Sequence, residues 1–467
     1  MQTRLTSMDA SFLEVESPTA HMHVGWVALF RPQGDRPLPD FRALREHVAA
    51  RLPRAPRYRQ RLLRVPLRLN DPIWVDDTRF DIDEHVVHSP AAEIGQVVDE
   101  VLSVPLRHDR PLWELWVADR LADGRVGIVG KAHHCMVDGI AAVELASLLL
   151  DASPDPPGEP DDGWRPRPGP EGMDLLASAV RDRVLEGARL AGRAAGLVSR
   201  PRRLAGLIGD ARRAADALGS SMTPAPADGG LNDPISPDRR LAMIGRGLDE
   251  LRAVRARFGC TVNDVVLAAV SGGLRHFLMH RGVAPPRLKA MVPVNVRGGG
   301  DAGALGNRIS FMFVPLPCDE PDPVRRLMNV HLATSNCKRR GDAEGGDTVL
   351  RAFDYAPRTL QAAVSRLVAS PRTFNLVVSN IPGPAEPLYM LGCELEEAYP
   401  VVPLADRHAL SVGMTTVRDG AFFGVYADRA ALPDADDLAA AVDGALDELV
   451  ELAARPERDP HPEPALV

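Results

Sequence analysis

The stretch KAHHCMVDGI, residues 131–140, joins a strand-like segment to a helix-like one. The sequence VGIVGKAHH (126–134) has the apolar character of a strand, and IAAVELASLLL (140–150) has the apolar spacing of a helix. The CMVDG between them is predicted to be a turn, because Gly139 can adopt backbone dihedrals that other residues avoid. This strand–turn–helix arrangement indicates an α/β fold and places two histidines at the end of a strand.

The adjacent histidines, His133 and His134, are predicted to have different roles. Successive side chains of a strand point to opposite faces, so one ring should face a cavity while the other packs inward. A metal chelated by both is therefore not expected. A metal held by His134 and Asp138 would need both on one helix face, which the turn at Gly139 opposes, and no third ligand follows at a recognisable spacing. Two interpretations remain, a pair of ordinary core histidines and a catalytic base.

The chemistry open to a base at His134 is acyl transfer to a hydroxyl or amine. A neutral imidazole can take the proton of the attacking group, and an apolar tunnel would exclude water. Cys135 suggests an acyl-cysteine route as an alternative, although neighbours on an extended strand diverge. The chain has no GxSxG, and no helix pattern follows GGGDAG (298–303), so neither a serine nucleophile nor a dinucleotide site is expected.

Length, charge and cysteine usage exclude several classes of protein. The chain has 467 residues, which suggests two or three domains, and a formal net charge of -8, which argues against binding nucleic acid. Its five cysteines are scattered and form no CxxC pair, which favours a reducing compartment over a disulfide framework. No secretory signal is evident, and no apolar run approaches the roughly 20 residues that span a bilayer. We expect a cytoplasmic protein, at most peripheral on the inner membrane face or on lipid droplets.

Composition divides the chain into four parts. Residues 1–153 and 231–454 mix strand-like and helix-like segments and are predicted to be two α/β domains. Residues 154–230 are predicted to be a linker that begins rich in Pro and Gly, and residues 455–467 a disordered tail. Within the linker, arginines outnumber acids in the helix-like stretch 173–218. Such helices either lie on an anionic membrane surface or pack on the body with solvated arginines.

Further motifs follow one another in order along the chain. HHCMVDG (133–139) matches HHxxxDG, the motif of acyltransferases related to chloramphenicol acetyltransferase and to nonribosomal peptide condensation domains. Nearly the whole chain outside the linker resembles the bacterial wax ester synthase/diacylglycerol acyltransferase family, which includes mycobacterial triacylglycerol synthases. The stretches that carry this resemblance are SMDASFL (7–13), HMHVGWVALF (21–30), PIWVDDTRFDIDEHV (72–86), PLWELW (111–116), LNDPISPDRR (231–240), TVNDVVLAAV (261–270), VPVNVR (292–297), LGNRIS (305–310) and VSNIPGP (378–384).

The resemblance implies two chloramphenicol acetyltransferase-like domains, each a mixed β-sheet with helices, joined by a helical crossover and separated by a channel. It implies that His134 is the general base, that His133 supports it, and that Asp138 and Gly139 keep the shape of the turn. Asn263 would approach the reaction centre from the second domain, to orient substrate or bind the oxyanion.

Four further residues are assigned to the channel region by the same resemblance. Pro111, Leu112 and Trp113 would shape the channel, with ordinary packing as the alternative for each. Asp264, the partner of Asn263, would be structural and lie beside them.

The resemblance also implies the reaction. We expect a long-chain acyl group to pass from acyl-CoA to diacylglycerol, or to a long-chain alcohol, by direct displacement and without a cofactor or metal. The alternatives are a related acyltransferase that uses a polyketide-derived or carrier-bound alcohol, and a non-catalytic lipid-binding or lipid-droplet protein. Departures from the family pattern at Asp233, His408 and Met414 leave the acceptor preference open.

Overall fold

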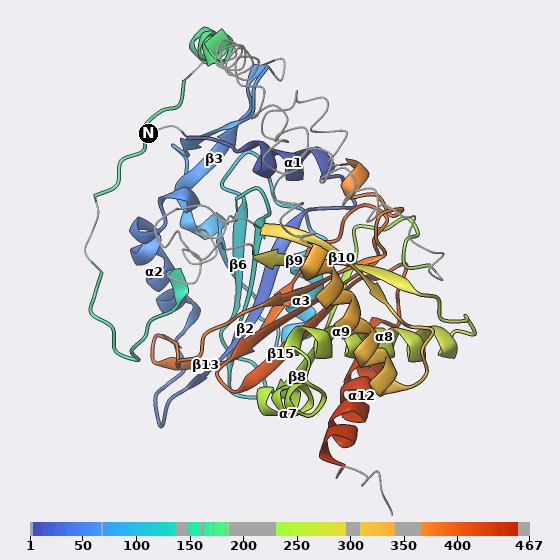
Figure 1. Ribbon diagram of the computed structural model, residues 1–467. Helices are drawn as coiled ribbons and strands as arrows, with labels where there is room; N and C mark the ends of the chain where they lie inside the picture. Colours follow the sequence, from blue (N-terminus) through green and yellow to red (C-terminus); the bar gives the residue numbers. More distant parts are fainter. Residues whose placement is uncertain are drawn as a thin grey trace, which may run out of the picture.

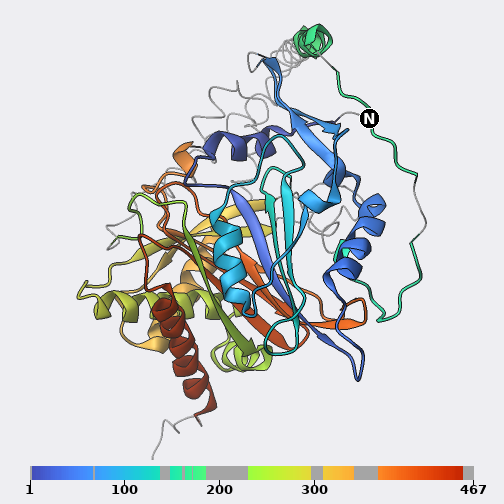
Figure 2. The same cartoon turned by 180° about the vertical axis from the view of Figure 1, so that it is seen from behind.

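The computed structural model describes residues 3–66, 69–136, 148–159, 163–170, 172–182, 184–185, 230–295, 309–340 and 366–455. In these residues the chain forms two six-stranded sheets and one three-stranded sheet, with helices packed around them (Figures 1 and 2). The predicted α/β architecture of mixed sheets flanked by helices is confirmed. Much of the predicted helix at 140–150, of the linker and of the tail lies outside the described residues.

The sheet that carries the histidine pair contains strands from both halves of the chain. Its order is β12-β13-β2-β7-β6-β5, antiparallel except for the parallel pair β5 and β6. Figure 1 shows β13 beside β2, although more than 350 residues separate them in the sequence. The strands are β2 (His23–Pro32), β5 (Val86–His88), β6 (Trp113–Ala118), β7 (Val126–His133), β12 (Tyr389–Met390) and β13 (Cys393–Val401).

The second large sheet belongs wholly to the second half of the chain. Its order is β10-β9-β11-β14-β15-β8, and β11 runs parallel to both of its neighbours, β9 and β14. The strands are β8 (Arg239–Gly247), β9 (Leu288–Asn295), β10 (Ile309–Leu316), β11 (Leu376–Ile381), β14 (Leu410–Val417) and β15 (Gly420–Asp428). The helices beside this sheet are α7 (Leu248–Phe258), α8 (Val262–His280), α9 (Pro323–Arg340) and α12 (Ala435–Ala454).

A small antiparallel sheet and further helices belong to the first half. The sheet has the order β1-β4-β3, and the helices are α1, α2 and α3. The bounds are β1 (Thr3–Arg4), β3 (Gln60–Leu63), β4 (Ile73–Asp76), α1 (Ser7–Val15), α2 (Phe41–Arg51) and α3 (Ile94–Ser103), with short 3-10 turns at Leu52–Arg54, Pro56–Arg59 and Ile82–Glu84.

One hydrophobic core runs through both halves of the molecule. All eight residues of β7 are buried, which explains why this strand has an apolar run instead of alternating polar residues. Helix α3 contacts both β7 and β8, and Asp99 of α3 pairs with Arg240 of β8 at 2.7 Å. Because β13 also joins the first sheet, the two predicted domains are interlocked rather than simply linked. The residue boundaries proposed for them stay a prediction.

Candidate active site

The end of β7 is held by backbone hydrogen bonds on both sides. The N–H of His133 donates to the carbonyl of Leu112 at 2.9 Å, and the N–H of His134 donates to the carbonyl of Met22 at 2.9 Å. The strand ends at His133, one residue earlier than the sequence pattern predicts, and His134 begins the turn. Met22 has a φ of 49°, in the left-handed region that a bulky residue adopts only at some cost in energy. The backbone at the histidine pair is therefore fixed from two sides.

His133 is completely buried and packs inward. Its Nδ1 accepts a hydrogen bond from the N–H of Cys135 at 3.1 Å, so the neutral ring carries its proton on Nε2. That Nε2 lies 3.7 Å from Oε2 of Glu16, whose other oxygen accepts from Nε2 of His108 at 2.9 Å. Burial lowers the pKa of His133 to about 4, and the nearby Glu16 opposes this shift. His133 is therefore neutral at physiological pH.

His134 lies in different surroundings from its neighbour. Its ring stacks on the ring of Phe12 from α1, with centroids 3.7 Å apart and planes inclined by 16°. The residue is half-buried, and its Nδ1 is enclosed without a hydrogen-bond partner on another described residue. Burial lowers the pKa of His134 to about 4, against an opposing contact with its own backbone. A neutral imidazole is therefore available as a proton acceptor.

Cys135 is buried beside the histidines. Burial raises the pKa of its thiol well above the usual value, and the negative charges of Asp9 and Glu16 act in the same direction. A thiolate is the form of cysteine that attacks acyl groups. The environment of Cys135 therefore opposes the acyl-cysteine alternative.

The predicted channel residues Pro111, Leu112 and Trp113 have buried side chains. Trp113 donates from Nε1 to the carbonyl of Tyr58 at 2.8 Å and stacks on His85 with centroids 4.7 Å apart. The segment reaches the histidine pair through its backbone, by the Leu112 carbonyl described above. The predicted role of these side chains in shaping a channel stays a prediction.

The second half places Asn263 and Asp264 at the start of α8. Asp264 is buried and forms a capping box with Thr261, and its carboxylate also accepts from His331 Nδ1 at 2.9 Å and from Thr334 Oγ1 at 2.7 Å. Burial alone would raise the pKa of Asp264, but these hydrogen bonds outweigh it and lower the pKa. Asn263 is half-buried, and no hydrogen bond among the described residues joins it to the histidine pair.

Asp138 and Gly139 lie outside the described residues. The side chains of His408 and Met414 are both buried. His408 precedes β14, and Met414 lies within it. Neither contacts the histidine pair by a hydrogen bond or ring contact in the described part of the chain.

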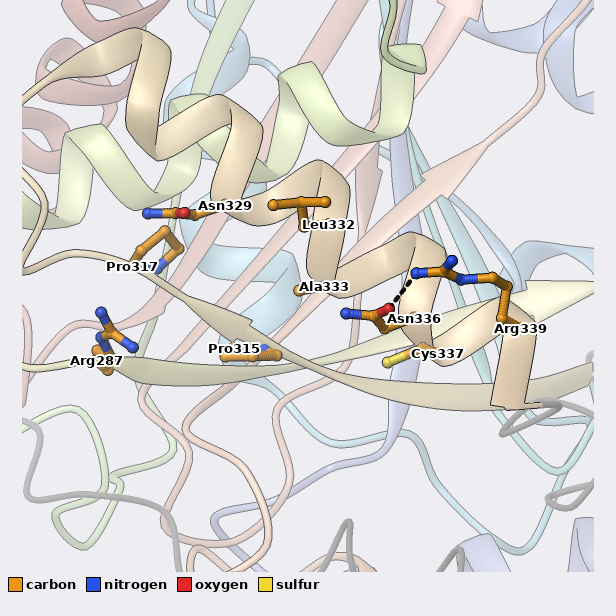
Figure 3. Close-up of a pocket in the computed structure, with 9 residues that line it drawn as sticks. All are labelled: Arg287, Pro315, Pro317, Asn329, Leu332, Ala333, Asn336, Cys337 and Arg339. Carbon is orange, nitrogen blue, oxygen red and sulfur yellow. Dashed lines mark hydrogen bonds between the residues drawn. The ribbon is translucent and has the colours of Figure 1, made fainter.

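The surface has two pockets of note, and His134 lines neither of them. The larger, of about 670 Å³, lies between α9 and the end of β10, where Leu332 and Asn336 face Pro315 and Pro317 (Figure 3). The smaller, of about 220 Å³, is lined by residues of α1 together with Glu16 and the arginine Arg64. Within the described residues, no three His, Cys, Asp or Glu side chains are grouped to hold a metal ion, and no helix is long and apolar enough to cross a membrane.

Three residues at the site were not singled out from the sequence: Phe12, Glu16 and His108. Phe12 lies in the SMDASFL stretch that carries the family resemblance, but nothing in that stretch indicates which side chain contacts a histidine more than 100 residues later. Glu16 and His108 have no spacing signal at all.

Comparisons with known proteins agree with the motifs. The sequence profile of the wax ester synthase/diacylglycerol acyltransferase catalytic domain matches residues 5–266, and that of the WS/DGAT C-terminal domain matches residues 305–450. A probable diacylglycerol O-acyltransferase of Mycobacterium tuberculosis is 33% identical, over 97% of this chain and 96% of the relative.

Solved structures show the same relationship. A wax ester synthase/diacylglycerol acyltransferase from Marinobacter aquaeolei aligns with a TM-score of 0.68 and 28% identity, over 97% of this chain and all of that one. The starter condensation domain of rhizomide synthetase aligns with a TM-score of 0.57 at 14% identity, over 97% and 95% of the two chains, and this likeness concerns the fold.

The fold is shared with a wax ester synthase/diacylglycerol acyltransferase and with condensation domains, and the site places a histidine pair at the end of a buried strand. The chain belongs to the wax ester synthase/diacylglycerol acyltransferase family and is an acyltransferase. The resemblance inferred from the motifs is confirmed.

Proposed function

We propose that this enzyme transfers a long-chain acyl group from acyl-CoA to the hydroxyl of diacylglycerol or of a long-chain alcohol. The names of its relatives, a diacylglycerol O-acyltransferase and a wax ester synthase/diacylglycerol acyltransferase, support both acceptors. The observation that carries the proposal is the neutral imidazole of the half-buried His134 at the fixed end of β7.

In the proposed reaction, His134 removes the hydroxyl proton as the acceptor oxygen attacks the thioester carbonyl. The tetrahedral oxyanion that forms needs a hydrogen-bond donor, a role we assign to the side-chain amide of Asn263. Collapse of this intermediate breaks the carbon–sulfur bond, and the CoA sulfur leaves with the proton held by His134. His133 supports the base, and Asp138 and Gly139 shape the turn. Because the proton, the carbon–sulfur bond and the leaving CoA are all accounted for, the proposed reaction needs no cofactor or metal.

The deciding assay measures CoA release from palmitoyl-CoA with diolein or with hexadecanol as acceptor. His134→Ala should lower kcat by about 10²- to 10⁴-fold, the usual contribution of a general base. His276→Ala is the matched control, because this histidine of α8 is exposed. An inert wild-type enzyme with both acceptors, or full activity in His134→Ala, would refute the proposal.

We further propose that the helix at 172–182 and 184–185 contacts an anionic lipid surface. Its inner face packs Leu175 and Ala179 against the small sheet of the first half, in a separate apolar cluster. Its outer face exposes a stripe with helical spacing, which comprises Met173, Ala177, Val180 and Val184. The helix forms one tip of the molecule (green, at the top of Figure 1).

Two further observations favour a lipid surface as the occupant. Arg181 is exposed next to the stripe, and arginines outnumber acids across the stretch 173–218. Basic residues flanking an apolar face suit anionic headgroups. An apolar acceptor such as diacylglycerol is also dissolved in membranes, so such contact would bring the enzyme to its substrate.

Flotation with vesicles of phosphatidylcholine and phosphatidylglycerol at about 3:1 tests this contact. The double variant Val180→Asp/Val184→Asp should lose most of its binding. The control Leu332→Asp changes an equally exposed apolar residue on α9 and should bind as wild type does. Unchanged flotation of the double variant would contradict the proposal.

A further inference from the structure

Phe12 and Glu16 lie one helical turn apart at the end of α1 and face the two histidines. The N–H of Glu16 donates to the carbonyl of Phe12 at 3.1 Å, so the two residues are held in a fixed relation. Phe12 stacks on His134, and the Glu16 carboxylate faces Nε2 of His133. One helix end therefore contacts both members of the pair.

We propose that α1 is a positioning element for the active site, in which Phe12 orients the ring of His134 and Glu16 orients the ring of His133. The inference rests on the proposed role of His134 as the base and adds two residues to it. Both are positioning residues, because they act through the histidines.

Phe12 takes a role that a hydrogen bond usually fills. A catalytic histidine is normally oriented by a carboxylate or carbonyl bonded to its second nitrogen. Nδ1 of His134 has no such partner on another described residue, and the nearly parallel ring of Phe12 is a contact that limits how the imidazole tilts. The same ring covers one face of His134 and keeps water from it.

Glu16 acts on the buried neighbour. The Cys135 N–H occupies Nδ1 of His133, which leaves the proton of the neutral ring on Nε2. This nitrogen is buried without a hydrogen-bond partner among the described residues, and the Glu16 carboxylate lies 3.7 Å from it. His108 holds that carboxylate in place through its other oxygen. Because His133 precedes His134 directly, a change in its packing is transmitted to the base by the backbone.

The charged groups around this end of β7 come from several elements. They act on Glu16, His133 and Cys135, whereas the lowered pKa of His134 is attributed to burial, opposed by its own backbone. These groups are Asp9, Glu16, Arg57, Arg64 and His108. Removing the cover of Phe12 is therefore the direct way to change the titration of the base.

The test of Phe12 uses the variants Phe12→Leu and Phe12→Ala in the full-length enzyme. Phe12→Ala should lower kcat by about 10- to 100-fold while KM for palmitoyl-CoA changes less than about threefold, because a displaced base slows chemistry more than binding. The fall of kcat/KM at low pH should begin about one pH unit higher, because water that reaches the ring favours its protonated form. Phe12→Leu keeps the apolar cover and should move the limb less.

Phe41→Leu is the matched control. Phe41 also lies against a histidine, His88, with ring centroids 5.0 Å apart, but this pair is on α2 and β5, outside the site. Its kcat and pH profile should equal those of wild type. If Phe12→Ala folds with a normal Tm and keeps the wild-type kcat and acid limb, Phe12 has no positioning role.

Glu16→Gln tests the second contact by ring ¹⁵N NMR, with signals assigned from the His133 and His134 alanine variants. Glu16→Gln should shift the His133 signals and leave the acid limb of activity in place, whereas Phe12→Ala should shift those of His134. Unchanged His133 signals in Glu16→Gln would remove Glu16 from the inference.

The experiments distinguish a wrong role for Phe12 from a wrong proposed function. The NMR titration of His134 in wild type and Phe12→Ala needs no turnover, so it reports on the ring contact even if no acceptor is converted. An active wild type with an inactive His134→Ala but an unaltered Phe12→Ala would preserve the function and refute only the role of Phe12.

Discussion

Gly424 of β15 lies directly against the backbone of Pro400 in β13, so close that a methyl group on Gly424 would clash with the Pro400 carbonyl oxygen. Its register partner on β14, Gly413, is also pressed against Pro400. Because β13 belongs to the sheet with the histidines and β15 to the other sheet, this pair of glycines lets the two sheets meet. The interlock of the two halves depends on this close approach.

The first prediction concerns this contact. Gly424→Ala should lower the free energy of unfolding by about 1–3 kcal/mol, because the neighbouring atom is backbone and cannot rotate away. Gly444→Ala is the control, since Gly444 lies in α12 with open space beside it and alanine favours a helix by about 0.5–1 kcal/mol. Thermal unfolding should show a lower Tm for the first variant and an equal or higher Tm for the second. An unchanged Tm for Gly424→Ala would mean that the two sheets shift to accept the methyl group and that this close approach does not limit stability.

The second prediction concerns the pH dependence of activity. Burial lowers the pKa of His134 to about 4, and a general base works in its neutral form, so activity is lost only as pH falls toward that value. We expect kcat/KM to stay level from about pH 8 down to about pH 5.5, with no limb near the ordinary histidine pKa of about 6.5. The measurement is a kcat/KM profile with hexadecanol, with each sample returned to pH 7.5 to check that the enzyme is intact. A limb centred near 6.5 would show that water reaches the ring in the free enzyme.

A third prediction separates direct displacement from the cysteine route. Cys135→Ala should keep kcat within about threefold of wild type, because a buried thiol with a raised pKa behaves as a small apolar side chain. Intact-mass analysis after mixing wild type with palmitoyl-CoA alone should reveal no palmitoyl adduct. Abolished activity in Cys135→Ala together with a trapped adduct in wild type would establish an acyl-enzyme instead.

The fourth prediction assigns Asp264 to structure rather than chemistry. Asp264→Asn weakens the capping box and the contacts to His331 and Thr334, so it should cost about 1–3 kcal/mol of stability. At a temperature well below Tm, kcat should remain within about threefold of wild type. Asp249→Asn, at an exposed acid in the first turn of α7, is the control and should change neither quantity. A normal Tm with a large loss of kcat in Asp264→Asn would place this carboxylate in the reaction.

Local patterns predicted much of the fold because they depend on neighbours in the sequence. The apolar run at 126–134 identified β7 to within one residue of its observed end. The two histidines differ in burial, since His133 is fully buried and His134 is half-buried, but His134 begins the turn and lies outside the strand. The roles of the individual site residues stay predictions until the variants above are measured.

The sequence by itself determined the family, the order of the motifs and the histidine pair at the end of a strand, because each of these is written in residues that lie close together along the chain. Only the tertiary structure decided that β13 crosses into the first sheet, and that Phe12 and Glu16 face the two histidines. These contacts join residues separated by more than 100 positions, and the packing of buried side chains selects them. No local spacing encodes that packing, because it depends on how every layer of the core fits the next.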